Sequence, residues 1–454
     1  MSRNSSGILS KMWSRLWPKG GNEINAASGS ASEIYSTWTK EQLINKIQEL
    51  ESTQCSSEKQ KIKPLLKRKD VDDTNNNDTN TLQKKKKIKT FNFYKYNTRF
   101  IALRFAYLGW NYNGLAVQKD PTPLPTVEGV ILESLFKCKL VPSLDIQEYS
   151  FSRCGRTDKG VSAMNQVISL KIRSNLTPEQ QLDPNYDDKE IDYVLVLNQN
   201  LPPDIRVSAV CLRPPNGFNA RHSCIHRHYK YLFKQGDGDI DSYLDLERME
   251  KACKYLEGEH DFRNFCKIDG SKQITNFKRY IRQCKIIKVG DSSDDMYCLD
   301  LIGSAFLWHQ VRCMMGTLFL IGQRLEEPEL ILDMFDINKT PQKPLYDMAS
   351  DLPLILYDCK FPEMEWIVKN FKPYKRVNNV RATVLNYELK STITKLFQQV
   401  LPSTDAFNRK ERVCINLGDG VGKVVRKYEK VKDRKVMQSV EAINAKYRAN
   451  RRMK

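Results

Sequence analysis

The chain has 454 residues, a formal net charge of +19 and 40% hydrophobic residues. This length accommodates two domains or one large core with tails, and no apolar run approaches the roughly 18–20 residues that span a bilayer. The positive charge favours a polyanionic partner. Twelve cysteines occur without a Cys-x-x-Cys pair, which excludes the common zinc patterns and predicts reduced thiols in a soluble protein.

Residues 1–96 predict a basic, largely disordered extension. Apolar and basic residues in Met1–Lys19 fit either a mitochondrial targeting sequence or a peripheral helix. Thr39 begins a short amphipathic helix. Basic clusters at 61–69 and 84–89 are typical of a solvated tail, a nuclear-import signal or an RNA-gripping arm. We expect the nucleus and cytoplasm as the location, with mitochondrial targeting as the alternative.

An ordered region is predicted from about residue 97, because hydrophobic residues there alternate or recur at helical spacing. The predicted strands are 101–107, 167–172, 205–211, 228–233, 280–289 and 297–302. The predicted helices are 127–139, 244–256, 308–323 and 439–452. This mixture predicts an α/β or α+β fold. We divide it into a first half (97–235), a second half (236–371) and a basic C-terminal extension (372–454).

The stretch Ser152–Ala163 places Asp158 between Arg156 and Lys159, with Arg153 close by. An exposed aspartate ionises near pH 3.9 without help, whereas a buried one needs nearby cations to stay charged. The clustered cations therefore indicate a carboxylate that must remain anionic inside a pocket, as a nucleophile or base does. By this argument alone, a structural loop remains equally open.

Two further segments combine cations with aromatic residues, namely Phe218–Tyr231 and Ala305–Arg312. Bases in structured RNA must be extruded before chemistry reaches them, and aromatic side chains then stack on the exposed ring. Tyr229 is a candidate for such stacking, or a core residue. Arg312 lies among apolar neighbours and needs a carboxylate, for which Asp158 is the natural candidate.

The segment Phe218–Tyr231 also has a spacing of side chains that is typical of metal ligands. His222, Cys224, His226 and His228 alternate, as ligands on one strand face would. The neighbouring Arg221 and Arg227 favour phosphate contacts instead. The glycine-rich stretch 418–423 lacks the first glycine and the Ser/Thr of a phosphate-binding loop, so we expect no nucleotide site there.

Arg156–Ala163 resembles the signature of the TruA family of tRNA pseudouridine synthases. The other matching positions are 107–114, 118, 126–127, 218–221, 229–231, 306–312 and 349–356. Pro353 departs from a glycine that is usual in the last of these. The stretches 154–155, 164–167, 258–269 and 307–310, with the basic C-terminal tail, resemble the eukaryotic branch that acts on uridines 38 and 39 of the tRNA anticodon arm.

The resemblance implies two RNA-recognition-like halves that share a mostly antiparallel central sheet, with a cleft between them. It also implies isomerisation of uridine to pseudouridine without a cofactor or a metal. Asp158 would be the nucleophile and Arg156 would hold the RNA open around the flipped base. Tyr229 would stack on the target ring, Arg312 would pair with Asp158, and Leu354 would pack beneath the uracil.

Three more residues are candidates for substrate binding: Lys159, Arg221 and His309. The expected partner is tRNA, with mRNA as a further candidate, and the family precedent favours a homodimer. Two alternatives remain open. The chain could perform the same chemistry on another RNA, such as small nuclear or messenger RNA, or at another tRNA position. It could also be an RNA-binding scaffold without catalysis.

Overall fold

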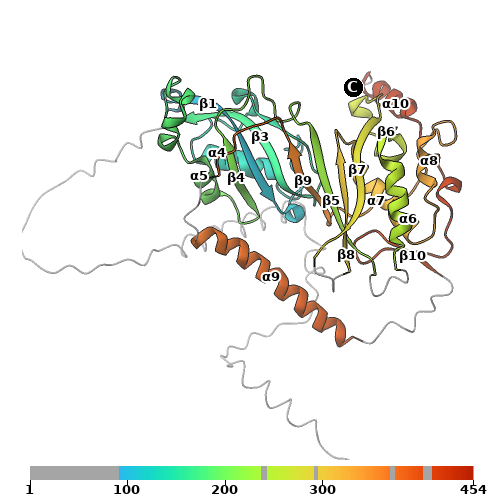
Figure 1. Cartoon of the computed structure of the whole chain (residues 1–454). Helices are drawn as coiled ribbons and strands as arrows, with labels where there is room; N and C mark the ends of the chain where they lie inside the picture. Colours follow the sequence, from blue (N-terminus) through green and yellow to red (C-terminus); the bar gives the residue numbers. More distant parts are fainter. Residues whose placement is uncertain (1–90, 237–242, 291–294, 369–373, 402–411, 453–454) are drawn as a thin grey trace, which may run out of the picture. The chain divides into compact units, whose positions relative to one another are not determined.

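The computed structural model in Figure 1 describes residues 91–236, 243–290, 295–368, 374–401 and 412–452. The chain divides into two compact units, 1–87 and 88–454. The candidate targeting sequence Met1–Lys19, the helix predicted after Thr39 and both basic clusters lie outside the described residues. The fold below is that of the second unit.

Nine strands of the described residues form one sheet, in the order β4-β1-β3-β9-β5-β8-β7-β6, with β2 pairing with β3. Their bounds are β1 Asn97–Tyr107, β2 Ser152–Arg153, β3 Ser162–Ser174, β4 Ile205–Cys211, β5 His226–Lys234, β6 Gly258–Asp261, β7 Lys278–Lys288, β8 Met296–Gly303 and β9 Leu354–Lys360. The pairings are antiparallel, except that β3 and β9 run parallel. A small separate hairpin joins β10 (Val413–Ile415) to β11 (Lys423–Val425).

Most of the described helices pack around this sheet, whereas α9 lies apart from it, with its described side chains largely exposed. Their bounds are α4 Val127–Lys137, α5 Tyr193–Asn200, α6 Leu246–Leu256, α7 Gln310–Gly322, α8 Leu330–Phe335, α9 Tyr374–Gln399 and α10 Val440–Arg452. In Figure 1, α4 and α5 lie near β1, β3 and β4, whereas α6 and α7 lie near β7 and β8. Side chains cap the first three helices: Thr126, Asp192 and Asp245 each accept a backbone N–H of the first turn. The α7 helix is almost wholly buried.

Most of the predicted elements are confirmed. Every predicted strand and helix corresponds to a described element, with ends that differ by a few residues. The sequence patterns did not predict α5, α8 and α9, nor the strands β2, β6, β9, β10 and β11. The mixed fold with a mostly antiparallel sheet is also confirmed. The boundary we drew at residue 235 directly follows β5, whose neighbours β8 and β9 both come from the second half, so the sheet continues across it.

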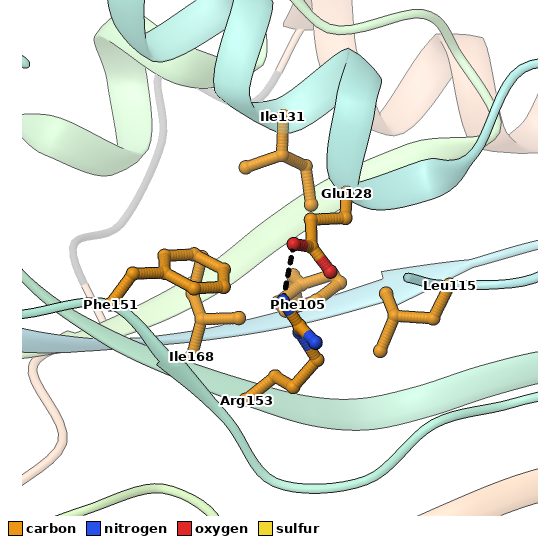
Figure 2. A pocket seen from close by; sticks show the side chains of 7 residues that line it. All are labelled: Phe105, Leu115, Glu128, Ile131, Phe151, Arg153 and Ile168. Carbon is orange, nitrogen blue, oxygen red and sulfur yellow. Dashed lines mark hydrogen bonds and ion pairs between the residues drawn. The ribbon is translucent and has the colours of Figure 1, made fainter. Parts of the chain in front are cut away.

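A buried ion pair connects α4 to β2 (Figure 2). A guanidinium nitrogen of Arg153 lies 2.6 Å from Oε1 of Glu128, and the two side chains are 18% and 3% exposed. Phe105, Leu115 and Phe151 are among the apolar residues around them. Burial raises the pKa of Glu128, and the charge of Arg153 is the main influence that opposes this rise. The pair therefore fixes the strand from which the Asp158 loop departs.

We predict that Arg153→Met destabilises the protein by about 3 kcal/mol, because it leaves the Glu128 carboxylate buried without a counter-charge. The matched control is Lys251→Met, which breaks the exposed pair between Lys251 and Glu329 and should change stability far less. Urea unfolding followed by tryptophan fluorescence measures both. Equal losses in the two variants would contradict the structural role of the buried pair.

Candidate active site

Asp158 lies in the loop between β2 and β3, and hydrogen bonds fix this loop on both sides of it. The Thr157 hydroxyl lies 2.7 Å from the Tyr107 hydroxyl, in the interior. The Leu115 N–H donates to the carbonyl of Thr157 at 3.2 Å, and the Val161 N–H donates to the carbonyl of Asp158 at 3.2 Å. The backbone of Asp158 therefore has little freedom, as a catalytic group requires.

Two glycines allow close contacts around this loop. Gly114 has φ +86°, and a Cβ there would lie 2.7 Å from the carbonyl oxygen of Thr157. Gly160 has φ +81°, and a Cβ there would lie 2.1 Å from a carboxylate oxygen of Asp351. Both positions combine a left-handed backbone with a lack of space, so each needs glycine.

The Asp158 side chain is only 31% exposed, and its Oδ2 lies 3.5 Å from Nε2 of His309. Burial raises the pKa of Asp158 above 3.8. The charge of Arg312, the indole N–H of Trp308 and the charge of Lys267 oppose this rise, while the charge of Asp351 adds to it. The groups that tune Asp158 therefore come from the second half of the chain.

This arrangement corrects the prediction that Arg153, Arg156 and Lys159 keep Asp158 charged. Arg153 is paired with Glu128. The side chains of Arg156 and Lys159 are exposed and form no ion pair in the part of the chain that the structure describes. Proximity in sequence is misleading here, because a tight loop directs neighbouring side chains to different sides. Arg156 and Lys159 remain available to an external anion.

Arg312 is close to Asp158, but it does not form the predicted ion pair with it. Its Nε donates to the carbonyl of Ala349 at 2.7 Å, and a terminal nitrogen lies 3.4 Å from Oδ1 of Asp351. The Arg312 side chain is only 12% exposed. Its carboxylate partner in this structure is Asp351, and it influences Asp158 through its charge.

Tyr229 and Leu354 come from the adjacent strands β5 and β9. Tyr229 is 9% exposed, and its ring meets that of Phe306 edge to face, with centroids 4.9 Å apart. Its pKa is raised chiefly by burial, with a contribution from the charge of Asp158. Leu354 is 4% exposed and opposes Tyr231 on β5. Because β9 lies between β3 and β5, the sheet itself brings Tyr229 and Leu354 to the Asp158 loop.

The remaining candidates differ in how far their side chains are exposed. Arg221 is exposed, like Arg156 and Lys159. Arg227, for which we predicted a phosphate contact, donates through its guanidinium to the carbonyls of Ser304 and Cys154 at 2.8 and 2.9 Å. His309 has φ +60°, and its side chain is 10% exposed.

His309 is a neutral imidazole in this site. Burial and neighbouring cations lower its pKa to about 4. Its Nδ1 is buried and has no hydrogen-bond partner among the described residues. A left-handed backbone and an unsatisfied buried nitrogen are costly, and such strain is typical of functional sites.

The histidines predicted to alternate on one strand face do not all do so, since β5 begins only at His226. His228 lies 2.6 Å from a carboxylate oxygen of Asp300. Among the described residues, no cluster of three His, Cys, Asp or Glu side chains has the geometry of a metal site.

The described helices also include none that is long and apolar enough to cross a membrane.

Three residues of the site were not identified from the sequence: Lys267, Trp308 and Asp351. The Lys267 ammonium lies 4.7 Å from the ring centroid of Trp308, and both influence Asp158. Lys267 and Trp308 stood in stretches that served only as markers of the branch, and Asp351 stood in the apolar motif 349–356. The polar residues inside these otherwise apolar or family-specific stretches were the sequence signal that could have pointed to the site.

Comparison with known proteins gives consistent results. Residues 252–362 match a family described as tRNA pseudouridine synthase. The chain is 58% identical to the tRNA pseudouridine(38/39) synthase of Saccharomyces cerevisiae, over 93% of this chain and 94% of the relative. It is 39% identical to the mouse protein of the same name, over 80% and 75% of the two chains. It is 38% identical to the human protein of that name, over 77% and 72%.

One solved structure, of an archaeal box H/ACA sRNP Nop10-Cbf5 complex, matches 48% of this chain and 45% of its own at 14% identity. The TM-score of 0.20 is too low for a comparison of folds.

We predict that Gly114→Ala destabilises the protein by roughly 2 kcal/mol more than Gly217→Ala does. Both glycines have positive φ, but a Cβ at Gly217 has nothing within 4 Å. The difference therefore isolates the contact with the Asp158 loop from backbone strain. Thermal or urea unfolding measures it, and equal losses would show that this contact is not tight.

We predict that Asp158→Asn raises the melting temperature at pH 7. Between 3.8 and the raised pKa of Asp158, the folded state binds more protons than the unfolded state, so stability falls as pH rises through this window. The asparagine side chain of the variant does not titrate, so the substitution removes this loss of stability. The gain should shrink as the pH falls through the window and vanish below it. A variant that is equally or less stable at pH 7 would contradict the pKa direction.

Proposed function

This chain belongs to the family of tRNA pseudouridine synthases, and on that premise we propose that it isomerises uridines 38 and 39 of the anticodon stem-loop with Asp158 as the nucleophile. The positions are those in the names of the yeast, mouse and human relatives. The observation that carries the assignment of Asp158 is its combination of a fixed loop, burial and surrounding cations. A structural aspartate has no need of this combination.

The reaction moves one bond and one proton. The N1–C1′ glycosidic bond breaks, the uracil turns, and C5 bonds to C1′. The hydrogen on C5 leaves as a proton, and N1 gains one. As the nucleophile, the Asp158 carboxylate bonds either to C6 of the ring or to C1′ as the N1–C1′ bond breaks, and this bond to Asp158 breaks again once C5 has bonded to C1′. Because the groups around it are fixed before substrate arrives, little reorganisation is needed when charge develops.

The target base must leave the RNA stack before Asp158 can reach it. We assign Tyr229 and Leu354 to the two apolar contacts of the extruded uracil. Their support is that both are buried residues on strands adjacent to the Asp158 loop. His309 would contact the bound nucleotide or Asp158, through the nitrogen 3.5 Å from Oδ2. These contacts hold the ring near the nucleophile while it turns.

Three exposed cations would bind the RNA outside this pocket. Arg156 is adjacent in sequence to the buried Thr157, so it can hold the strands apart where the base has left. Lys159 and Arg221 would contact phosphates. Because such contacts release counterions, affinity for tRNA should fall steeply with salt. We also propose that the RNA occupies a cleft between the halves 97–235 and 236–371, that mRNA is a further substrate, and that the protein works as a homodimer.

The test is release of tritium from C5-labelled uridine in unmodified tRNA, because forming the C5–C1′ bond expels that hydrogen. We expect release from positions 38 and 39 with wild-type protein and none with Asp158→Asn, whose tRNA affinity should stay within a few fold. Asp188→Asn, which changes an exposed carboxylate, is the control and should remain fully active. Turnover by Asp158→Asn would refute the nucleophile, and release only from other positions would refute the site assignment.

A further inference from the structure

Three thiols that the proposed mechanism does not use lie close together beside β5. Cys154 directly follows β2, Cys224 lies in the loop before β5, and Cys359 lies on β9. Each of these thiols is within hydrogen-bonding reach of the other two, and all three are free. Segments that are far apart in the sequence therefore place three sulfur atoms side by side.

Arg227 holds the backbone around these thiols. Its guanidinium donates to the carbonyl of Cys154 at 2.9 Å and to that of Arg221 at 3.2 Å. It also donates to the carbonyl of Ser304 at 2.8 Å. In the pairing of β5 with β9, Arg227 lies opposite Cys359. One positive charge thus lies among the three segments that carry the thiols.

The three thiols differ in exposure and in acidity. Cys154 and Cys359 are 1% and 7% exposed, whereas Cys224 is half-buried. Hydrogen bonds from the other two thiols lower the pKa of Cys224, and the charges of Arg227 and His226 add to this effect. Solvent therefore reaches a thiol that ionises readily, and two buried thiols lie next to it.

One contact opposes the ionisation of Cys224. Its protonated thiol donates to the carbonyl of His226 at 3.3 Å. Two thiol donors and the Arg227 charge act in the other direction and are the stronger influence.

Cys154 is a better partner for Cys224 than Cys359 is. The hydrogen bond from Cys154 is the largest influence on the pKa of Cys224. Cys154 follows a strand of only two residues, whereas Cys359 is held within β9, between β3 and β5. The pair of Cys154 and Cys224 thus needs the smaller movement to bring its sulfur atoms to the length of an S–S bond, about 2.05 Å.

We propose that Cys224 and Cys154 form a site of reversible oxidation, at which hydrogen peroxide converts the two thiols to a disulfide. The Cys224 sulfur attacks one peroxide oxygen, the O–O bond breaks, and the leaving hydroxide takes up a proton to become water. The Cys154 sulfur then attacks the sulfenic acid on Cys224. The S–O bond breaks, and a second water leaves with the Cys154 proton. The two thiols lose two electrons, which reduce the peroxide.

The disulfide would affect the reaction through the backbone of Cys154, which lies four residues before Asp158. The Cys154 N–H donates to the carbonyl of Val167 at 2.9 Å, and its own carbonyl accepts from Arg227. A shift of Cys154 therefore strains the loop that carries Asp158. Because misplacing a catalytic group by about 1 Å can cost roughly a hundredfold in rate, oxidation should slow the isomerisation. This effect rests on the proposed function, whereas the oxidation itself does not.

The test exposes the full chain briefly to hydrogen peroxide and then maps its disulfides by mass spectrometry without reduction. The same samples are assayed for single-turnover tritium release, with protein in excess over tRNA. We expect one new disulfide, between Cys154 and Cys224, and a rate that is lower on the order of tenfold. Dithiothreitol should restore both thiols and the rate.

Three variants identify the sulfur atoms that react. Cys224→Ser should have the rate of the untreated wild type and keep it after peroxide. Cys154→Ala should form no disulfide, and dimedone should then capture the sulfenic acid on Cys224.

Cys138→Ser is the matched control. Cys138 is also half-buried, and its thiol also donates to a carbonyl, that of Val196 at 3.9 Å. Burial raises its pKa, so it should not react, and this variant should lose its rate with peroxide as the wild type does.

The inference would be overturned if both thiols stayed reduced, if the disulfide formed through Cys359, or if the rate loss persisted in Cys224→Ser. A mapped disulfide with an unchanged rate would refute the effect on the Asp158 loop. The mapping needs no turnover. It therefore still tests the thiol pair if the untreated protein releases no tritium and the proposed function itself fails.

Discussion

The site depends on one constraint: a carboxylate removed from much of its water must stay in place and remain reactive. Burial raises the pKa of Asp158, and the backbone on each side of it is hydrogen-bonded to other segments. Cations near the carboxylate oppose the rise in its pKa. Arg312, which is held by Ala349 and Asp351, and Lys267 supply this charge. The structure thus trades some stability for a prepared nucleophile.

The sheet makes this arrangement possible. The parallel pair β3–β9 is the junction, because β3 follows the Asp158 loop and β9 follows the segment with Asp351. On its other edge β9 pairs with β5, which carries Tyr229. Segments nearly two hundred residues apart in sequence therefore converge on one place, and the glycine at position 160 allows two of them to touch.

The sequence predicted the elements with strong local periodicity, such as β4 and α4, and the loop chemistry that singled out Asp158. It missed α5, because eight residues between acidic and proline-rich stretches carry little helical signal. It missed α9, whose large apolar side chains from Val380 onward are exposed and so give no core-facing stripe. The predicted ion-pair partner of Arg312 was wrong for a different reason. Which of two carboxylates an arginine contacts depends on the pairing of distant strands, and local sequence patterns do not contain that information.

The most direct test of this account is the titration of Asp158 itself by carbon-13 NMR of aspartate carboxyls, with the resonance assigned by its loss in Asp158→Asn. The account predicts a pKa above 3.8 in the wild type and a further rise when Arg312 is changed to methionine. A pKa at or below 3.8, or one that does not respond to the loss of Arg312, would contradict it.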